Sequence, residues 1–187
     1  MENQQSTEAE SPSLMNHAIK HGVILGVISI LLVIICYVVD FSLMVTFKFL
    51  GLALVVGLGY VIYAGINYRT EVGGYMPYGK AFMHGLVVLA ISGLIGTAFN
   101  IALYHIIDPD LPQKLLDTAI RNTEEMMAGF GMQQEAIDQA VEGMRTDMAD
   151  QFSIGGQALG YLKAIIAYCI IALITALFVR KNIPLEA

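Results

Sequence analysis

The sequence predicts an all-α polytopic membrane protein, with four transmembrane helices and an extramembrane amphipathic helical hairpin between helices three and four. Hydrophobic residues make up 56% of the 187 residues and charged residues only 14%, whereas soluble domains carry about 25% charged residues. The apolar residues gather in four runs, each long enough to supply the roughly 20 helical residues that cross a hydrocarbon core. Because no water satisfies backbone groups in that layer, such runs form helices.

Residues 1–16 are predicted to form a disordered tail, and residues 17–187 a four-helix transmembrane domain. The tail is polar and mildly acidic and shows no apolar periodicity, which is typical of segments that cannot bury enough surface to fold. It also lacks the basic start and the short apolar core of a signal peptide. We therefore expect the first apolar run to remain in the mature protein.

The four spans are expected at about residues 22–39, 43–66, 80–106 and 161–179. Small and polar residues recur along one side of the third span, within an arc of about 100° on a helical wheel. They are Ala81, Gly85, Ser92, Gly96 and Asn100. Helices in lipid associate through close backbone approach and interhelical hydrogen bonds, so this stripe is the predicted helix-packing seam.

Three histidines lie near the ends of the first and third spans. His17 and His21 are one helical turn apart on either side of Lys20, and His84 follows the start of the third span. A metal pair at His17 and His21 is conceivable, but no third ligand lies near them in the sequence. We interpret the three histidines as interfacial residues, and we expect no metal and no cofactor.

A sizeable polar region, residues 111–154, separates the third span from the fourth. It contains two amphipathic helices on either side of Gly129, Phe130 and Gly131. The second helix carries an apolar stripe at helical spacing, Ile137, Val141, Met144 and Met148, and acidic residues occupy its other faces. We predict that this stripe packs on the mouth of the bundle or faces a partner.

Four spans place both chain ends on one side of the membrane. Arg69, Lys80, Arg180 and Lys181 crowd against span ends on that side, and the positive-inside rule then favours cytoplasmic termini and a periplasmic hairpin. The opposite side gathers an outer-face charge cluster of Asp40, Lys48, His105, Asp108, Asp110 and Lys163. These charges either mark where the spans end or form a salt-bridged girdle that holds the hairpin on the bundle.

Several segments resemble one family. The first span contains HGVILGVIS, the third opens with YGKAFMHG and leaves through HIIDPDLP, and the last span ends in RKN. This layout is similar to the bacterial domain of unknown function 4199 family of small four-span membrane proteins. The resemblance implies the bacterial inner membrane and suggests a membrane-associated glycosyltransferase as a partner. It supplies no activity and no catalytic residues.

The leading interpretation is a non-enzymatic protein that binds a protein partner or a second copy, as a scaffold or accessory subunit surrounded by membrane lipid. The alternative is a small-molecule or lipid transporter or channel that acts as an oligomer, with Ser92, Thr97 and Asn100 as its polar lining. An enzyme is disfavoured because the spans carry no Ser/His/Asp set and no His-Glu-x-x-His motif. No basic cluster suggests nucleic acid.

Overall fold

The computed structural model describes residues 13–182, which form helices and no strand. The predicted tail covers residues 1–16. Residues 1–12 lie outside the described part of the chain, and residues 14–16 belong to the first helix. The elements are α1 (Leu14–Asp40), the 3₁₀ helix η1 (Phe41–Val45), α2 (Phe47–Glu71), α3 (Tyr78–Ala102), the π-helix η2 (Leu103–Ile107), α4 (Leu111–Gly129), α5 (Gln134–Phe152) and α6 (Ile154–Val179).

Four stretches of the described chain are helices long and apolar enough to cross a membrane. They are Leu14–Val45, Phe47–Glu71, Tyr78–Ile107 and Ile154–Val179. The predicted all-α, four-span architecture is therefore confirmed. Polar side chains at three junctions set the helix starts, since each accepts a hydrogen bond from a backbone N–H that lacks a helical partner. The N-cap residue is Asp40 for η1, Thr46 for α2 and Ser153 for α6.

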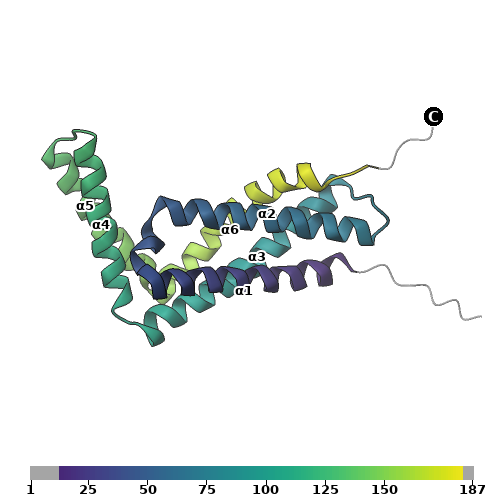
Figure 1. Ribbon diagram of the computed structural model, residues 1–187, viewed down its shortest axis with the longest axis horizontal. Coiled ribbons are helices and arrows are strands. Elements are labelled where there is room, and N and C mark those ends of the chain that lie inside the picture. The colour runs from purple at the N-terminus through teal and green to yellow at the C-terminus, as the bar shows by residue number, and fades with distance from the viewer. Residues whose placement is uncertain (1–12, 183–187) are drawn as a thin grey trace, which may run out of the picture.

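The four membrane-length helices form one elongated bundle (Figure 1). Helix α3 makes its most extensive contacts with α1 and α6. Gly22 and Gly26 allow the close approach of α1, because a Cβ on either glycine would lie within about 3 Å of Ile91 or Ile95 on α3. This is the small-residue contact through which helices pack in lipid.

Helix α2 packs on the bundle through its second half. Its buried residues, Val61, Ala64, Gly65 and Tyr68, all lie in that half. In the first half, Phe47, Leu50 and Val55 are exposed, so α2 diverges from its neighbours toward the end at which it begins. This divergence leaves space between helices that the functional site occupies.

The beginning of α1 and the end of α6 lie at one end of the bundle (Figure 1). There Met76 and Lys181 pair through two backbone hydrogen bonds of 2.9 Å. Arg69 donates from Nη1 to the carbonyl of Val179 at 2.7 Å, which satisfies a carbonyl in the last turn of α6, where a cation is also favoured by the helix dipole. We refer to this end as the termini end.

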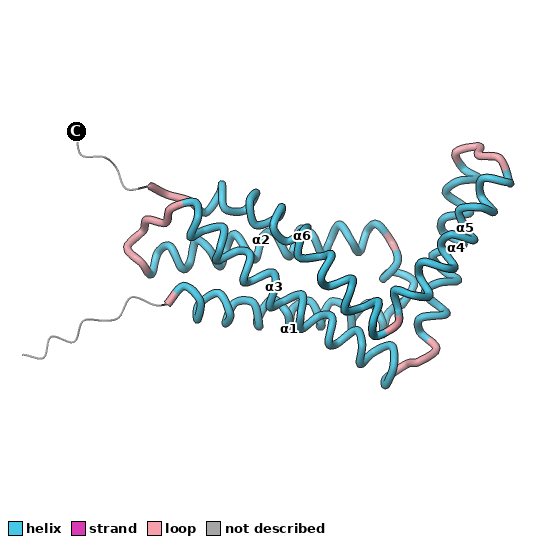
Figure 2. Tube along the Cα trace, turned by 180° about the vertical axis from the view of Figure 1, so that it is seen from behind, coloured by secondary structure: helices cyan, strands magenta, loops and turns pink. Residues whose placement is uncertain are grey.

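Helices α4 and α5 pack against each other and extend from the opposite end of the bundle (Figure 2). We call residues 111–152 the α4–α5 arm. Its base is an apolar cluster in which Leu103, Tyr104, Leu111 and Leu115 are buried. Residues from α1, η1 and the end of α5 pack around that cluster, so the base of the arm is joined to the bundle by a hydrophobic contact.

Candidate functional site

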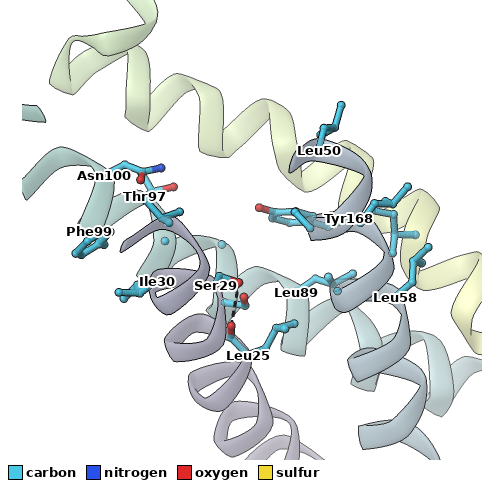
Figure 3. A pocket seen from close by; sticks show the side chains of 18 residues that line it. Leu25, Ser29, Ile30, Leu50, Leu58, Leu89, Thr97, Phe99, Asn100 and Tyr168 are labelled. Carbon is cyan, nitrogen blue, oxygen red and sulfur yellow. Dashed lines mark hydrogen bonds between the residues drawn. The ribbon is translucent and has the colours of Figure 1, made fainter. Parts of the chain in front are cut away.

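An interhelical pocket of about 420 Å³ lies between α1, α2, α3 and α6 (Figure 3). Most of its lining is apolar and includes Leu50, Leu54 and Leu89. A few polar side chains interrupt this lining: Ser29, Ser92, Thr97, Asn100 and Tyr168. A mostly apolar cavity with a few polar groups is the usual composition of a small-molecule site, and its volume falls within the usual range of about 300–1,000 Å³.

Glycines account for the empty space. Gly57 on α2 and Gly96 on α3 line the pocket, and a Cβ on either would meet no atom of the described chain within 4 Å. Gly93 has a different role, because a Cβ there would overlap the side chain of Tyr168. Leu50 is 64% exposed, so the α2 wall is thin and the pocket opens to the surroundings of the bundle.

A second and more polar cavity, of about 710 Å³, lies where α5 and α6 meet the second half of α3. We call it the vestibule. The charged side chains of its lining are those of Asp147, Asp150 and Lys163. Two glutamines add uncharged polar groups. Thr97 and Tyr168 line the vestibule and also the interhelical pocket. A charged cavity and an apolar cavity therefore share two wall residues.

The predicted seam is divided between two environments. Ala81, Gly85 and Ser92 are buried, and a Cβ on Gly85 would lie 3.3 Å from Val61 Cγ1. Gly96 and Asn100 are only half-buried and line the interhelical pocket, as Ser92 also does. One face of α3 therefore packs against its neighbours near the termini end and forms a pocket wall farther along.

The predicted charge cluster contributes several separate contacts at the base of the arm. Asp108 pairs with Lys114 at 3.3 Å and accepts a hydrogen bond from the Tyr37 hydroxyl at 3.2 Å. His105 donates from Nε2 to the carbonyl of Phe152 at 3.1 Å. Within residues 13–182, no ion pair joins two of the six predicted residues. Lys114, which lies one turn into α4, is the partner that the sequence did not single out.

The remaining members of that cluster lie apart. The carboxylate of Asp40 accepts from the backbone N–H of Ser42, Lys48 is exposed, and Lys163 lines the vestibule. The N–H of Asp110 donates to the carboxylate of Asp108 at 3.2 Å, in the turn before α4. Desolvation opposes ionisation of Asp108, but hydrogen bonds from Lys114 and Tyr37 outweigh it and hold the pKa of this carboxyl below its usual value.

The apolar stripe of α5 is partly buried inside the arm. Ile137 is buried, and Val141, Met144 and Met148 are half-buried. The exposed apolar side chains of the arm lie instead at its tip, where Phe130 is 79% exposed and Met126 and Met132 are nearly half exposed. This tip is therefore the more accessible apolar surface of the arm.

A histidine cluster lies inside the bundle near the termini end. His17 and His21 on α1 and His84 on α3 are buried, and His84 has no exposed surface. His17 Nδ1 lies 3.0 Å from His84 Nε2, and His17 Nε2 lies 3.0 Å from Asn67 Oδ1. The carboxylate of Glu71 is 3.7 Å from the same Nε2 atom. In the part of the chain that the structure describes, no three His, Cys, Asp or Glu residues form a group that could hold a metal ion.

The sequence suggested interfacial histidines and did not indicate that their side chains are buried. Two aromatic contacts help to bury them: His17 stacks on His21 with ring centroids 4.3 Å apart, and Tyr68 stacks on His84 at 5.4 Å. One sequence signal could have indicated this environment. His84 precedes Gly85 of the seam, and residues beside a close helix contact are often enclosed by the neighbouring helix.

The four apolar helices and the helical bundle that they build fit a multi-pass membrane protein. The chain belongs to the family described as Protein of unknown function (DUF4199), whose model matches residues 20–181. The resemblance seen in the sequence is thereby confirmed. No curated protein and no solved structure matches the chain.

Proposed function

We propose that this protein is a non-enzymatic membrane protein that binds a lipid-like amphiphile. The apolar tail of the ligand occupies the interhelical pocket and its polar head occupies the vestibule. One observation carries this proposal: Thr97 and Tyr168 form part of the wall of both cavities. An amphiphile matches two adjoining cavities of different polarity, because its apolar tail then lies among apolar side chains and its polar head lies among charged ones.

The charges of the vestibule favour a zwitterionic head group. Asp147 and Asp150 supply two carboxylates, which attract an ammonium group, and Lys163 supplies one ammonium, which attracts a phosphate. A phospholipid with an ethanolamine head carries both groups. Such a ligand would enter from the bilayer past the thin α2 wall at Leu50 and Leu54.

Photo-crosslinking in nanodiscs tests this proposal. The probe is phosphatidylethanolamine with a diazirine on one acyl chain. Gly57→Leu and Gly96→Leu place a side chain in the pocket, where neither glycine has a neighbour within 4 Å. Gly59→Leu is the matched control, because Gly59 also lacks such neighbours but does not line the pocket. We expect the cross-linking yield to fall several-fold in the first two variants and to stay unchanged in the control.

Equal yields in all variants would contradict binding in the pocket. Cross-links between two copies of the chain through α2, in place of lipid adducts, would indicate that a second copy fills the space instead. Replacing the probe by one with a phosphatidylglycerol head tests the head-group assignment, since loss of the ammonium should lower the yield. Asp150→Asn should reduce this difference between the two probes.

A transporter is the related candidate, and the pocket favours it because Ser92, Thr97 and Asn100 all contribute to its lining. Flux of an amphiphilic dye or labelled lipid across reconstituted liposomes distinguishes transport from binding alone. Transport predicts a flux that Asn100→Leu removes. Binding without transport predicts cross-linking with no flux above that of protein-free liposomes.

We also propose that the protein lies in the bacterial inner membrane with its termini in the cytoplasm and the α4–α5 arm in the periplasm. The support is the positive-inside rule, applied to Arg69, Lys80, Arg180 and Lys181 at the termini end. The test replaces Cys36 and Cys169 by alanine and introduces a single cysteine at Gln133. Labelling of intact spheroplasts by a membrane-impermeant maleimide supports this orientation, and labelling only after lysis contradicts it.

A second role, as the accessory subunit of a protein partner, is favoured by the tip of the arm. Phe130, Met126 and Met132 expose apolar surface there, and adaptable methionines beside an aromatic side chain are typical of partner-binding surfaces. A photo-reactive amino acid at Phe130 should capture one protein at constant yield, and the same residue at Lys48 should not. A membrane-associated glycosyltransferase is the first candidate partner, and a second copy of this chain is the alternative.

A further inference from the structure

The hydrogen bonds of the histidine cluster determine where its protons lie. Asn67 Oδ1 is an acceptor, so the Nε2 atom of His17 that faces it carries a proton. A neutral His17 then has a lone pair at Nδ1, and this atom accepts from the Nε2–H group of His84. It follows that His84 has its lone pair at Nδ1.

That lone pair has no partner in residues 13–182. His84 is completely buried, and its Nδ1 atom makes no hydrogen bond within the described residues. A buried polar atom without a partner costs free energy, and such atoms are rare in folded proteins. This unpaired nitrogen, enclosed on a side chain that is hydrogen-bonded to a second histidine, is the acceptor that a proton-binding site requires.

We propose that His17 and His84 together bind a single exchangeable proton, and that Glu71 holds the resulting charge. The incoming proton binds Nδ1 of His84. The proton on Nε2 of His84 then crosses the 3.0 Å hydrogen bond to Nδ1 of His17, which keeps its own proton at Nε2. One proton enters and none leaves, so His84 stays neutral and His17 becomes the cation, 3.7 Å from the carboxylate of Glu71.

The geometry limits the pair to one proton. In the singly protonated form, Nδ1–H of His17 donates to Nε2 of His84, and the contact between the rings is retained. A second proton would place an N–H group on both of these facing nitrogens, which are only 3.0 Å apart. Two donors and two positive charges would then oppose each other in a buried site, an arrangement that is strongly unfavourable.

Charged and titratable groups from the adjoining helices surround the pair. On α1 they are Lys20 and His21, and on α3 Lys80 lies one turn before His84. On α2 they are Glu71, Tyr60, Tyr63 and Tyr68, of which Tyr60 bonds His21 at 2.9 Å. The buried residues of α6, Ala172, Thr175, Ala176 and Val179, do not titrate. Glu71 is therefore the anion that favours proton uptake, and Lys20 opposes it.

Proton uptake changes how α2 is held. In the neutral form, polar contacts join α2 to α1 through the amide of Asn67 and the hydroxyl of Tyr60. In the protonated form the attraction between His17 and Glu71 is added. At 3.7 Å this contact is an ion pair and not a hydrogen bond, and the attraction between opposite charges is stronger in a low-dielectric site than in water. Because the first half of α2 forms the thin wall of the interhelical pocket, the attachment of its second half sets the position of that wall.

The test is an NMR titration of ¹⁵N-histidine-labelled protein in nanodiscs between about pH 4 and pH 8, the range in which histidines change charge. The chain has only four histidines, so His21→Gln and His105→Gln variants assign the signals. We expect His84 Nδ1 and His17 Nδ1 to be unprotonated at high pH. One proton should then be taken up by the pair, with coupled signals from both rings.

Glu71→Gln separates a proton site from a merely structural contact. The Glu71 side chain is 42% exposed, so the variant should fold, and the titration midpoint of the pair should move to lower pH. Asp138→Asn, an exposed carboxylate on the arm, is the control and should leave the midpoint unchanged. Independent titration of the two rings, uptake of two protons, or no uptake across the range would each overturn the proposal.

Discussion

His17 and His84 lie 67 positions apart in the sequence, yet Nδ1 of one ring is 3.0 Å from Nε2 of the other. This contact joins the first turn of α1 to the second turn of α3 by a polar interaction, and Gly22 and Gly26 continue the same interface by close packing. An apolar core that includes Val61 and Val88 lies farther along the bundle. The inside of the termini end therefore combines this polar contact with an apolar cluster that includes Met76 and Ala176, and the interhelical pocket lies toward the opposite end.

The first prediction concerns the glycine contact between α1 and α3. Gly22→Ala would place a Cβ 2.7 Å from that of Ile91 and 3.0 Å from the carbonyl oxygen of Val88. A backbone atom cannot move aside cheaply, so we expect a loss of about 1–3 kcal/mol in the free energy of unfolding. Denaturation in mixed micelles by increasing the fraction of SDS measures this quantity.

Gly59→Ala is the matched control for that experiment. No atom of the described residues lies within 4 Å of its Cβ position, and alanine favours a helix over glycine by up to about 1 kcal/mol. The control should therefore be neutral or slightly stabilising. If Gly22→Ala behaved in the same way as Gly59→Ala, α1 and α3 would not pack as described.

The second prediction concerns the capping of α6 by Arg69. Arg69→Gln removes the guanidinium group that donates to the carbonyl of Val179, and a hydrogen bond to a charged group is worth about 1.5–3 kcal/mol. We expect a lower thermal midpoint in detergent and faster amide exchange in the last turn of α6. Arg180→Gln removes an exposed cation from the same region and should have little effect. An equal effect of both variants would point to net charge as the cause.

The third prediction concerns pH and the base of the arm. The pKa of Asp108 lies below its usual value because hydrogen bonds from Lys114 and Tyr37 favour the carboxylate. A carboxyl with a depressed pKa contributes stability that is fully present above its unfolded pKa, which is about 3.9 for aspartate, and is lost as the pH falls through the folded value. The base of α4 should therefore be equally protected from hydrogen exchange at pH 7 and pH 5, and should lose protection only in stronger acid.

Asp108→Asn should reproduce the acid effect at neutral pH, with faster exchange in the first turns of α4 and greater protease sensitivity of the arm. Lys163→Ala is the comparison, since Lys163 lines the vestibule and makes no ion pair within residues 13–182. Loss of protection in both variants would support the salt-bridged girdle, of which both residues are predicted members, in place of the Asp108–Lys114 pair alone. No loss in Asp108→Asn would contradict that pair as a support of the arm.

Much of the architecture could be predicted because it depends on composition along single segments. Four long apolar runs produce four membrane-length helices irrespective of how they pack, and the Asp108-Pro109-Asp110 exit precedes the start of α4 at Leu111. The family resemblance depends on the same segments. These features are local, and the composition of each segment is sufficient to find them.

The site depends instead on how the helices diverge. Gly57 and Gly96 resemble the packing glycines Gly22 and Gly26 in the sequence, but they line a cavity because the first half of α2 leaves the bundle. His17 and Asn67 are 50 positions apart, and no local pattern indicates their contact. Small residues in a membrane helix are compatible with a seam or with a pocket, and only the tertiary arrangement decides between them.

Native mass spectrometry of the protein released from nanodiscs that contain phosphatidylethanolamine tests the central claim most directly. We predict that the wild-type protein and Gly59→Leu retain a bound lipid, and that Gly57→Leu and Gly96→Leu lose it while remaining folded. Retention of the same lipid by all four proteins, or its absence from the wild-type protein, would contradict the assignment of the interhelical pocket as a lipid-binding site.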